Sequence, residues 1–419
     1  MSMVTERQGI SLKSDIISPV SSTLLRVSLS AFVALGLASC GEPHVQERDQ
    51  PPVIPIERDN GWRGELPLGF PTPNVPLDKQ MSPEKAELGR HLFYDPRLSL
   101  GGETSCASCH QQRYAFTDGE ARSRGATDEL TPRNSMSLTN AVYNSVFTWA
   151  NPNLDLLEEQ IVIPLFGERP VEMGLTGRED EVLSLLRSDS TYQRLFGAAY
   201  PDVSEPASLS AVVDALGAFT RSLVSGDSPF DRYVYHQEPD AISASALRGM
   251  NLFFSERLEC HHCHGGFNFS FSTSHANATQ LEVAFHNTGL YNLDDQGAYP
   301  INSLGIFEVS GDPNDMGRFR APTLRNVEVT APYMHDGSME TLEEVVRFYE
   351  AGGRHITEGP LAGDGRAHPL KSEFVSGFTL TDEERDDLIS FLKSLTDERF
   401  LTDERFADPW PSAQEQEQR

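Results

Sequence analysis

Apolar residues recur at helical spacing in two widely separated stretches of the chain. The first follows Ser82 and Pro83, a favourable N-cap and first-turn residue, and runs through Leu92. The second follows Thr381 and Glu384, whose spacing predicts a capping box. Its apolar positions are Leu388, Ile389, Phe391, Leu392 and Leu395. We therefore expect a mainly α fold built from amphipathic helices.

An internal repeat divides the helical region in two. Residues 89–98 (GRHLFYDPRL) resemble residues 249–258 (GMNLFFSERL), and each copy precedes a Cys-x-x-Cys-His motif. The repeat predicts two related units in tandem, 77–238 and 239–410, followed by a tail over 411–419.

The two Cys-x-x-Cys-His motifs predict the chemistry. They use four of the five cysteines, and consist of Cys106, Cys109, His110, Cys260, Cys263 and His264. This is the attachment signature of c-type haem, in which two thiols bind the vinyl groups and the histidine binds iron. One copy could belong to a zinc or redox site, but two copies favour a pair of covalent haem c groups. We expect two tandem cytochrome c-like domains with one haem each.

The fifth cysteine lies near the start of the chain. Cys40 follows an apolar stretch over residues 27–38, which Arg26 precedes. This arrangement predicts a bacterial lipoprotein signal over 1–39 with lipidation at Cys40, and an ordinary secretory signal is the alternative. The apolar stretch is too short to span a bilayer. We expect an exported protein on the periplasmic side, lipid-anchored to the outer membrane.

Composition limits the partners. Residues 40–76 are rich in proline and polar residues, which predicts a tether leading into an extended arm. The chain carries 62 acidic and 34 basic residues, for a formal net charge of −28. Such a charge disfavours nucleic acid and favours a basic protein partner, although a soluble acidic surface explains it equally well.

Reactivity depends on the ligand at the second face of each haem. No histidine occurs between residues 111 and 235, where Met136 and Met173 lie. If neither binds iron, the first haem has an open face for peroxide. Methionine ligation would instead make it a closed electron-transfer haem.

Several segments, in order, resemble the bacterial di-haem cytochrome c peroxidase and MauG superfamily. They span about residues 60–410 and include residues 93–97, 132–140, 170–174, 322–326 and 331–337. Residues 164–174, 285–289 and 311–313 further resemble the MbnH-like di-haem enzymes. The resemblance implies an open, peroxidatic first haem and a six-coordinate second haem.

The resemblance assigns roles around the first haem. Glu172 matches the acid on the open face, where a carboxylate can move a proton between the peroxide oxygens. A surface or helix-start acid is the alternative. Gln160 matches the neighbouring amide and Pro164 the proline that crowds the pocket, although the interval from Gln160 to Glu172 exceeds that of the peroxidases. The loop histidine that closes this haem in many cytochrome c peroxidases is absent.

The second haem is assigned a tyrosine ligand. Tyr349 stands where the cytochrome c peroxidases have methionine, as in MauG-like enzymes. An anionic oxygen ligand favours oxidised iron, whereas a thioether favours ferrous iron. A core tyrosine is the alternative, and the competing ligands are Met316, Met334, Met339 and His335.

Two further features come from the resemblance. Trp149 matches the tryptophan through which charge passes between the haems, with a core tryptophan as the alternative. A calcium ion is implied between the domains, bound by Asn134 and the carbonyls of Thr330 and Pro332. Leu258 replaces the tryptophan through which MauG oxidises its partner, so neither that route nor its substrate is implied.

Three functions remain open. The preferred hypothesis is a di-haem c peroxidase that uses hydrogen peroxide to form a high-valent di-haem state and then oxidises a side chain on a partner protein. By resemblance to MbnH-like enzymes, this is a tryptophan converted to kynurenine on a copper-associated partner. The second hypothesis is peroxide detoxification with electrons from a small cytochrome or cupredoxin. The third is a non-enzymatic electron carrier. Tyr349 and the missing loop histidine favour the first.

Overall fold

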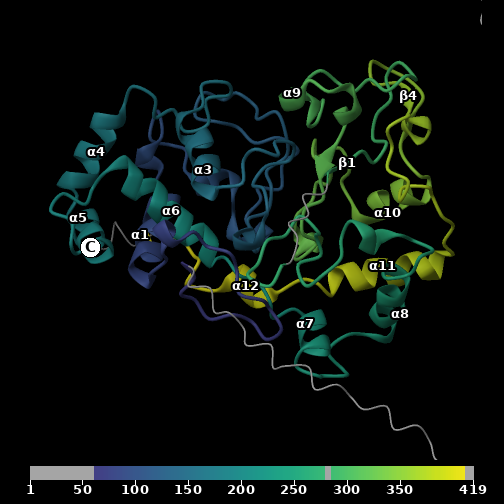
Figure 1. Cartoon of the computed structure of the whole chain (residues 1–419), viewed down its shortest axis with the longest axis horizontal. Coiled ribbons are helices and arrows are strands. Elements are labelled where there is room, and N and C mark those ends of the chain that lie inside the picture. Colours follow the sequence, from purple (N-terminus) through teal and green to yellow (C-terminus); the bar gives the residue numbers. More distant parts are fainter. Residues whose placement is uncertain (1–60, 279–284, 411–419) are drawn as a thin grey trace, which may run out of the picture. The chain divides into compact units, whose positions relative to one another are not determined.

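The computed structural model describes residues 61–278 and 285–410, and it is mainly helical with little sheet (Figure 1). This confirms the mainly α prediction. The helices are α1 (Pro83–Tyr94), α2 (Cys106–Cys109), α3 (Leu157–Phe166), α4 (Glu179–Ser188), α5 (Ser190–Ala199), α6 (Leu209–Ser222), α7 (Pro229–Val234), α8 (Ala244–Phe253), α9 (Phe307–Ser310), α10 (Leu342–Glu350), α11 (Asp382–Lys393) and α12 (Glu398–Thr402).

Two short antiparallel strand pairs complete the regular structure. β1 (Phe285–His286) pairs with β2 (Phe319–Arg320), and β3 (His355–Ile356) pairs with β4 (Gly363–Asp364). None of the described helices combines the length and apolar character that crossing a bilayer requires.

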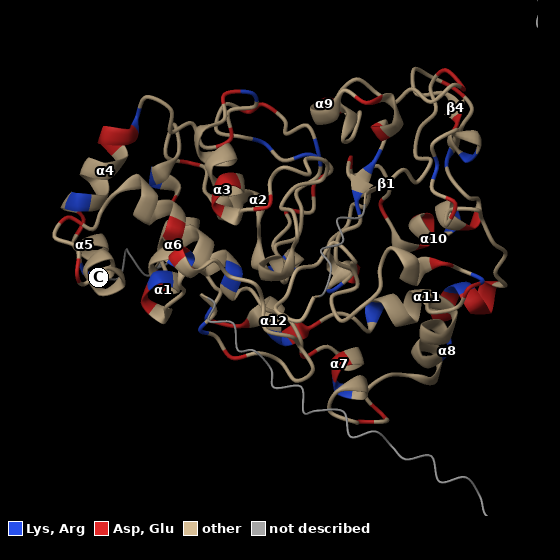
Figure 2. Cartoon of the chain, viewed as in Figure 1, with Lys and Arg blue, Asp and Glu red and all other residues tan. Residues whose placement is uncertain are grey.

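The helix starts expected from the sequence are present. The hydroxyl of Ser82 accepts a hydrogen bond from the amide of Lys85 at 3.1 Å, with Pro83 as the first residue of α1. At α11, Thr381 and Glu384 form the predicted capping box. Acidic residues fill the first turns of α4 and α11, where the ribbon is red in Figure 2. Negative charge at a helix N-terminus is favourable because it opposes the helix dipole.

Glycine marks the closest approach of two helix pairs, one in each half of the chain. α1 packs along α6, and α8 packs along α11. A Cβ added to Gly89 would lie 1.9 Å from the carbonyl oxygen of Ala215, and one added to Gly249 would lie 1.9 Å from that of Asp387. Both glycines are the first residues of the internal repeat. The repeat therefore reflects the same helix crossing made twice.

Gly249→Ala is expected to destabilise the protein. The added methyl group overlaps backbone rather than a movable side chain, so the helices must separate, at a cost of about 1–3 kcal/mol. Gly197→Ala in α5 is the matched control, because a Cβ there has open space, and alanine in an exposed helix is expected to gain about 0.5–1 kcal/mol. Denaturant unfolding of the two haem-loaded variants measures both changes. Equal changes in the free energy of unfolding for the two variants would contradict the close contact between α8 and α11 at Gly249.

Residues 398–410, which follow α11, pack against the first half of the chain. Phe400 and Phe406 are buried in the apolar cluster formed with α1, α5 and α6. The indole nitrogen of Trp410 donates to the carbonyl of His91 at 3.1 Å. Residues 398–410, within the range predicted for the second unit, thus contact the first. Residues 395–400 (LTDERF) are repeated as residues 401–406, and each copy supplies one of the buried phenylalanines.

Residues 61–76, the described part of the predicted arm, pack against the rest of the protein. Trp62, Phe70 and Val75 are buried together with Tyr143, whose hydroxyl donates to the carbonyl of Pro71 at 2.8 Å. The rest of the predicted tether, the signal over 1–39, Cys40 and the tail over 411–419 lie outside the described residues.

Candidate functional site

The first Cys-x-x-Cys-His motif forms the short helix α2 and the residue after it. His110 Nδ1 lies 2.7 Å from the carbonyl oxygen of Phe116, an acceptor that holds the proton on Nδ1 and leaves Nε2 as the metal-binding atom. Burial lowers the pKa of His110, which favours the neutral imidazole that metals bind. Burial, followed by Cys109 and Glu172, raises the pKa of the Cys106 thiol to about 12.

Glu172 lies close to this motif. The carbonyl of Glu172 accepts a hydrogen bond from Ala126 at 2.8 Å, and the next residue, Met173, donates from its amide to Pro164 at 3.0 Å. Burial raises the pKa of Glu172, and its charge in turn contributes to the raised pKa of both thiols. Within residues 61–278 and 285–410, no group donates a hydrogen bond to its carboxylate. The structure therefore brings Glu172, Pro164 and the two thiols together.

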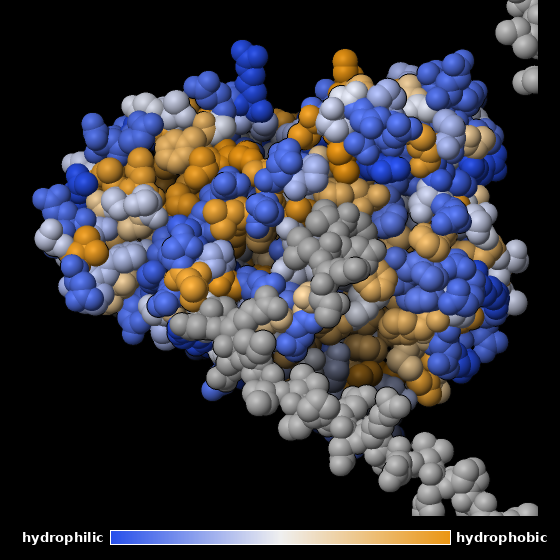
Figure 3. Space-filling model, in the orientation of Figure 1, coloured by the Kyte–Doolittle hydropathy of each residue, from blue (hydrophilic) through white to orange (hydrophobic). Residues whose placement is uncertain are grey.

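Helix α3 carries the other predicted residues of this site. The Oε1 atom of Gln160 is buried and has no hydrogen-bond partner among the described residues. Pro164 lies inside the same helix. Figure 3 shows apolar side chains gathered over the part of this face where α3 lies. Exposed apolar residues on α3 and the neighbouring segments are Leu100, Leu130, Val162 and Ile163. Such a surface suits a flat apolar ligand.

The second motif repeats the histidine arrangement of the first. Cys260–His262 form a 3-10 turn, η5. His264 Nδ1 lies 3.2 Å from the carbonyl oxygen of Phe269 and 3.1 Å from that of Pro322. Burial lowers the pKa of His264 to about 4. Nε2 of a neutral imidazole is again available to bind metal.

A cavity of about 230 Å³ opens beside the second motif. Its apolar wall comes mainly from the core that joins α8, α10 and α11, and includes Phe253, Leu258, Val327, Leu342, Val346, Leu388 and Leu392. Cys260, Cys263 and His264 lie along the same cavity. It therefore combines an apolar wall with a predicted haem attachment motif.

Tyr349, near the end of α10, lines this cavity. Its hydroxyl makes no hydrogen bond to any residue that the structure describes. Burial, followed by the nearby Cys263 and Cys260, raises the pKa of the phenol. An unpartnered phenol on the wall of a cavity that contains His264 fits the predicted ligand role.

Two of the competing ligands, His335 and Met339, have other contacts. His335 lines the cavity, but its Nε2 hydrogen-bonds with Ser303 and its ring stacks on Phe319 at 3.6 Å. Met334 lines the cavity, whereas Met339 is buried in a neighbouring apolar cluster.

The methionines that could close the first haem are also engaged. Met173 is buried in the first core. Met136 lines the second cavity, and its sulfur accepts a hydrogen bond from Arg320 at 3.5 Å.

Trp149 connects the two motifs. It lines the second cavity, and its indole nitrogen donates to the carbonyl of Asn134 at 2.9 Å. The adjacent Ser135 donates from its hydroxyl to the carbonyl of Cys109 at 2.8 Å. A short path through two adjacent residues therefore joins Trp149 to the first motif.

The predicted calcium ligands are found among the residues that line the second cavity. Asn134, Thr330 and Pro332 all line it. The backbone N–H of Asn134 donates to the backbone carbonyl of His335 at 2.9 Å, which links the segment of Asn134 to the segment that follows Pro332.

The sequence alone did not indicate Arg320. It is 3% exposed and lines the second cavity. It donates to the carbonyl of Thr148 and the side chain of Asn144, both at 3.2 Å, and no carboxylate pairs with it in the described part of the chain. Burial lowers its pKa to about 10. A buried cation without an acidic partner favours an anionic group in the cavity.

Comparisons with known proteins identify the family of this chain. A profile of the di-haem cytochrome c peroxidase family matches residues 83–239. Cytochrome-c peroxidase IdrP1 of Denitromonas iodatirespirans is 32% identical over 362 residues, which cover 79% of this chain and 86% of the relative. Methylamine utilization protein MauG of Methylorubrum extorquens is 32% identical over 320 residues, covering 76% and 80%.

A solved structure supports the finer resemblance. The crystal structure of a MauG-like protein associated with microbial copper homeostasis is 48% identical, with a TM-score of 0.81, and covers 84% of this chain and 100% of that one. The chain therefore belongs to the di-haem cytochrome c peroxidase family, and it is a haem-dependent oxidoreductase.

Proposed function

We propose that this chain is a di-haem c peroxidase that takes oxidising equivalents from hydrogen peroxide and uses them on a side chain of a partner protein. Two cytochrome c-like units, 77–238 and 239–410, each hold one covalent haem c. The observation that carries the proposal is the position of Tyr349 on the wall of the cavity that contains His264. An oxygen ligand there favours oxidised iron and disfavours the ferrous state that an electron carrier needs.

The residues present fit two haem groups. The thiols of Cys106, Cys109, Cys260 and Cys263 would attach them, and Nε2 of His110 and His264 would bind iron. Arg320 would pair with a propionate, the anion that its buried guanidinium lacks. When bound, the haems supply the redox chemistry that divides peroxide and stores its oxidising equivalents.

Glu172 is the proposed acid–base group at the first site. A carboxylate near the peroxide takes the proton from one oxygen and returns it to the other, which makes water the leaving group. A raised pKa makes Glu172 a better base than a solvent-exposed carboxylate. The family resemblance assigns two residues of α3 to the same site: Gln160, whose amide oxygen is buried without a partner among the described residues, and Pro164, which would crowd the pocket.

Trp149 supports exchange between the two sites. It lies on the wall of the second cavity and is linked to the first motif through Asn134 and Ser135. An indole between two redox centres divides one long electron transfer into two shorter ones. Calcium bound by Asn134 and the carbonyls of Thr330 and Pro332 would hold this connection in place.

The substrate is proposed from the relatives. The 48% identical MauG-like protein is associated with copper homeostasis, which supports a copper-associated partner. The resemblance to MbnH-like enzymes adds the proposal that a tryptophan of this partner is converted to kynurenine. The acidic surface suits a partner with a basic docking face. Reaction with such a partner requires export, and we propose a periplasmic location with a lipid anchor at Cys40.

The test is to mix fully ferric protein with stoichiometric peroxide, without reductant, and to record optical and Mössbauer spectra. Oxidation detected at both haems is expected. Reaction only after one haem has been reduced would favour a cytochrome c peroxidase supplied by a small redox protein. No reaction in either state would leave an electron carrier.

Tyr349→Phe should change the second haem alone. Without the phenolate oxygen, its ferric state loses stabilisation, so its reduction potential is expected to rise and its EPR signal to change. Tyr333→Phe is the matched control, because Tyr333 lines the same cavity but donates its hydroxyl to the carbonyl of Val327 at 3.0 Å. Redox titration with EPR checks both variants. An unchanged signal in Tyr349→Phe would exclude Tyr349 as the ligand.

A further inference from the structure

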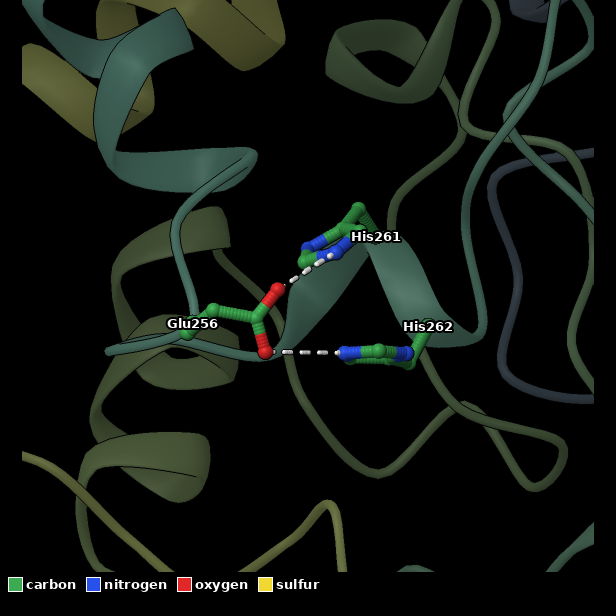
Figure 4. Close-up of side chains that lie close together, drawn as sticks. All are labelled: Glu256, His261 and His262. Atoms are coloured by element: carbon green, nitrogen blue, oxygen red, sulfur yellow. Dashed lines mark hydrogen bonds and ion pairs between the residues drawn. The ribbon is translucent and has the colours of Figure 1, made fainter.

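A group of metal-ligating side chains lies on the second Cys-x-x-Cys-His motif itself. The two residues between its cysteines are His261 and His262, and the carboxylate of Glu256 points toward both rings (Figure 4). Glu256 Oε1 lies 3.5 Å from Nε2 of His261, and Oε2 lies 3.5 Å from Nε2 of His262. Haem attachment requires neither histidine, because both occupy the variable positions of the motif.

The two distances from Glu256 to the histidines match the spacing of ligands on one metal ion better than that of hydrogen bonds, and the short contact of His262 is with Glu259, at 2.8 Å. Hydrogen bonds between N–H and oxygen usually span about 2.7–3.2 Å, which is shorter than either distance from Glu256. Two donors at about 2.0–2.1 Å from a tetrahedral ion lie roughly 3.3 Å apart. The ligand atoms of Glu256, His261 and His262 all fall within 4.8 Å of one another. One ion can therefore reach all three after small side-chain movements.

The histidine rings are already held in place. His262 stacks on Phe374, with ring centroids 4.5 Å apart and planes 8° from parallel. The His261 ring lies against that of His262 at 4.2 Å. Both residues belong to the η5 turn, which two thioether bonds would fix further. Little rotamer freedom remains to be lost on metal binding, which favours affinity.

The charge around the group also favours a cation. The carboxylate of Glu259 lies 2.8 Å from Nε2 of His262 and adds a second negative charge to that of Glu256. Arg257, next in sequence to Glu256, pairs with Glu384 at 2.6 Å. No lysine or arginine in the described ranges pairs with Glu256. A divalent ion would balance the two carboxylates.

We propose that Glu256, His261 and His262 bind one divalent first-row transition ion of the Zn²⁺ or Cu²⁺ type. Two imidazoles and a carboxylate match the preferences of these ions, and Cu²⁺ is expected to bind more tightly than Zn²⁺. The site is separate from the two predicted haem irons and does not depend on the proposed oxidation of a partner. Its occupancy would place a divalent charge on the loop that carries the second haem.

Titration of untagged, chelator-treated, haem-loaded ferric protein tests the site. Calorimetry with Zn²⁺ is expected to show binding at one site that depends on these side chains. Cu²⁺ is expected to give an EPR signal with hyperfine splitting from imidazole nitrogen. Glu256→Gln and His262→Gln are each expected to weaken Zn²⁺ binding at least about tenfold, since loss of even an outer-shell partner commonly costs that much.

His236→Gln is the matched control, because His236 is exposed and lies outside the group. Its Zn²⁺ affinity is expected to equal that of the unaltered protein. The haem absorption spectrum confirms that each variant is folded and loaded, and Glu256→Gln leaves the attachment motif intact. The proposal is overturned if the unaltered protein does not bind Zn²⁺, or if Glu256→Gln and His262→Gln bind it as tightly as His236→Gln does.

Discussion

Glu172→Gln is expected to slow the reaction of the ferric protein with peroxide about 10²–10⁴-fold, the usual contribution of a positioned acid–base group. Glutamine keeps the size of the side chain but cannot accept the proton of peroxide. The measurement is the second-order rate constant by stopped-flow absorption. Haem content should not change, because Glu172 does not belong to either attachment motif.

Glu168→Gln is the matched control, since Glu168 is exposed and lies four residues before Glu172. Its rate is expected to equal that of the unaltered protein. A Glu172→Gln rate within about threefold of the control would assign the proton transfer to another group. It would favour the alternative that Glu172 is a surface or helix-start acid without a role in catalysis.

The pH dependence of the same rate provides a second measure. The active form of Glu172 is the carboxylate, so the rate falls as the pH drops through its pKa. Burial raises that pKa above the ordinary value of a glutamate. The loss of rate should therefore begin at a higher pH than for an exposed carboxylate, and it should be absent in Glu172→Gln. A retained acid limb in the variant would point to a different titrating group.

Asp231→Asn is expected to lower the free energy of unfolding by about 3–5 kcal/mol, because it leaves a buried charge without its partner. Both side chains of the Arg325–Asp231 pair are fully buried, and the guanidinium donates to Asp231 at 2.8 and 3.0 Å. Arg325 also stacks over Phe70 at 4.6 Å, and Asp231 caps α7 through Ser228. The pair joins the arm, α7 and the segment after β2.

Glu343→Gln is the matched control for this pair. Glu343 forms an exposed ion pair with Arg347 one helical turn away, and such a pair contributes only about 0.3–0.5 kcal/mol. Denaturant unfolding of the haem-loaded variants measures both changes. A loss below about 1 kcal/mol in Asp231→Asn would show that water or a neighbouring group solvates Arg325 once the pair is broken.

Local patterns in the sequence determined much of the site. The spacing of Cys106, Cys109 and His110 predicts a haem attachment motif without knowledge of the fold, because the bonding groups are close together in the chain. The starts of α1 and α11 were predictable for the same reason, since a cap depends on residues within one turn. The choice of Tyr349 as a candidate ligand came instead from the family resemblance, and the structure places it on α10 at the wall of the second cavity.

Only the tertiary structure revealed the contacts between residues that are far apart in the sequence. Arg320 shows no sequence signal, yet it lines the second cavity without an acidic partner in the described chain. Arg325 and Asp231 are 94 residues apart, and no local rule pairs them. The return of Phe400 to the first core could not be predicted either. Caps and attachment motifs depend on neighbours along the chain, whereas these contacts depend on which distant segments together bury the most apolar surface.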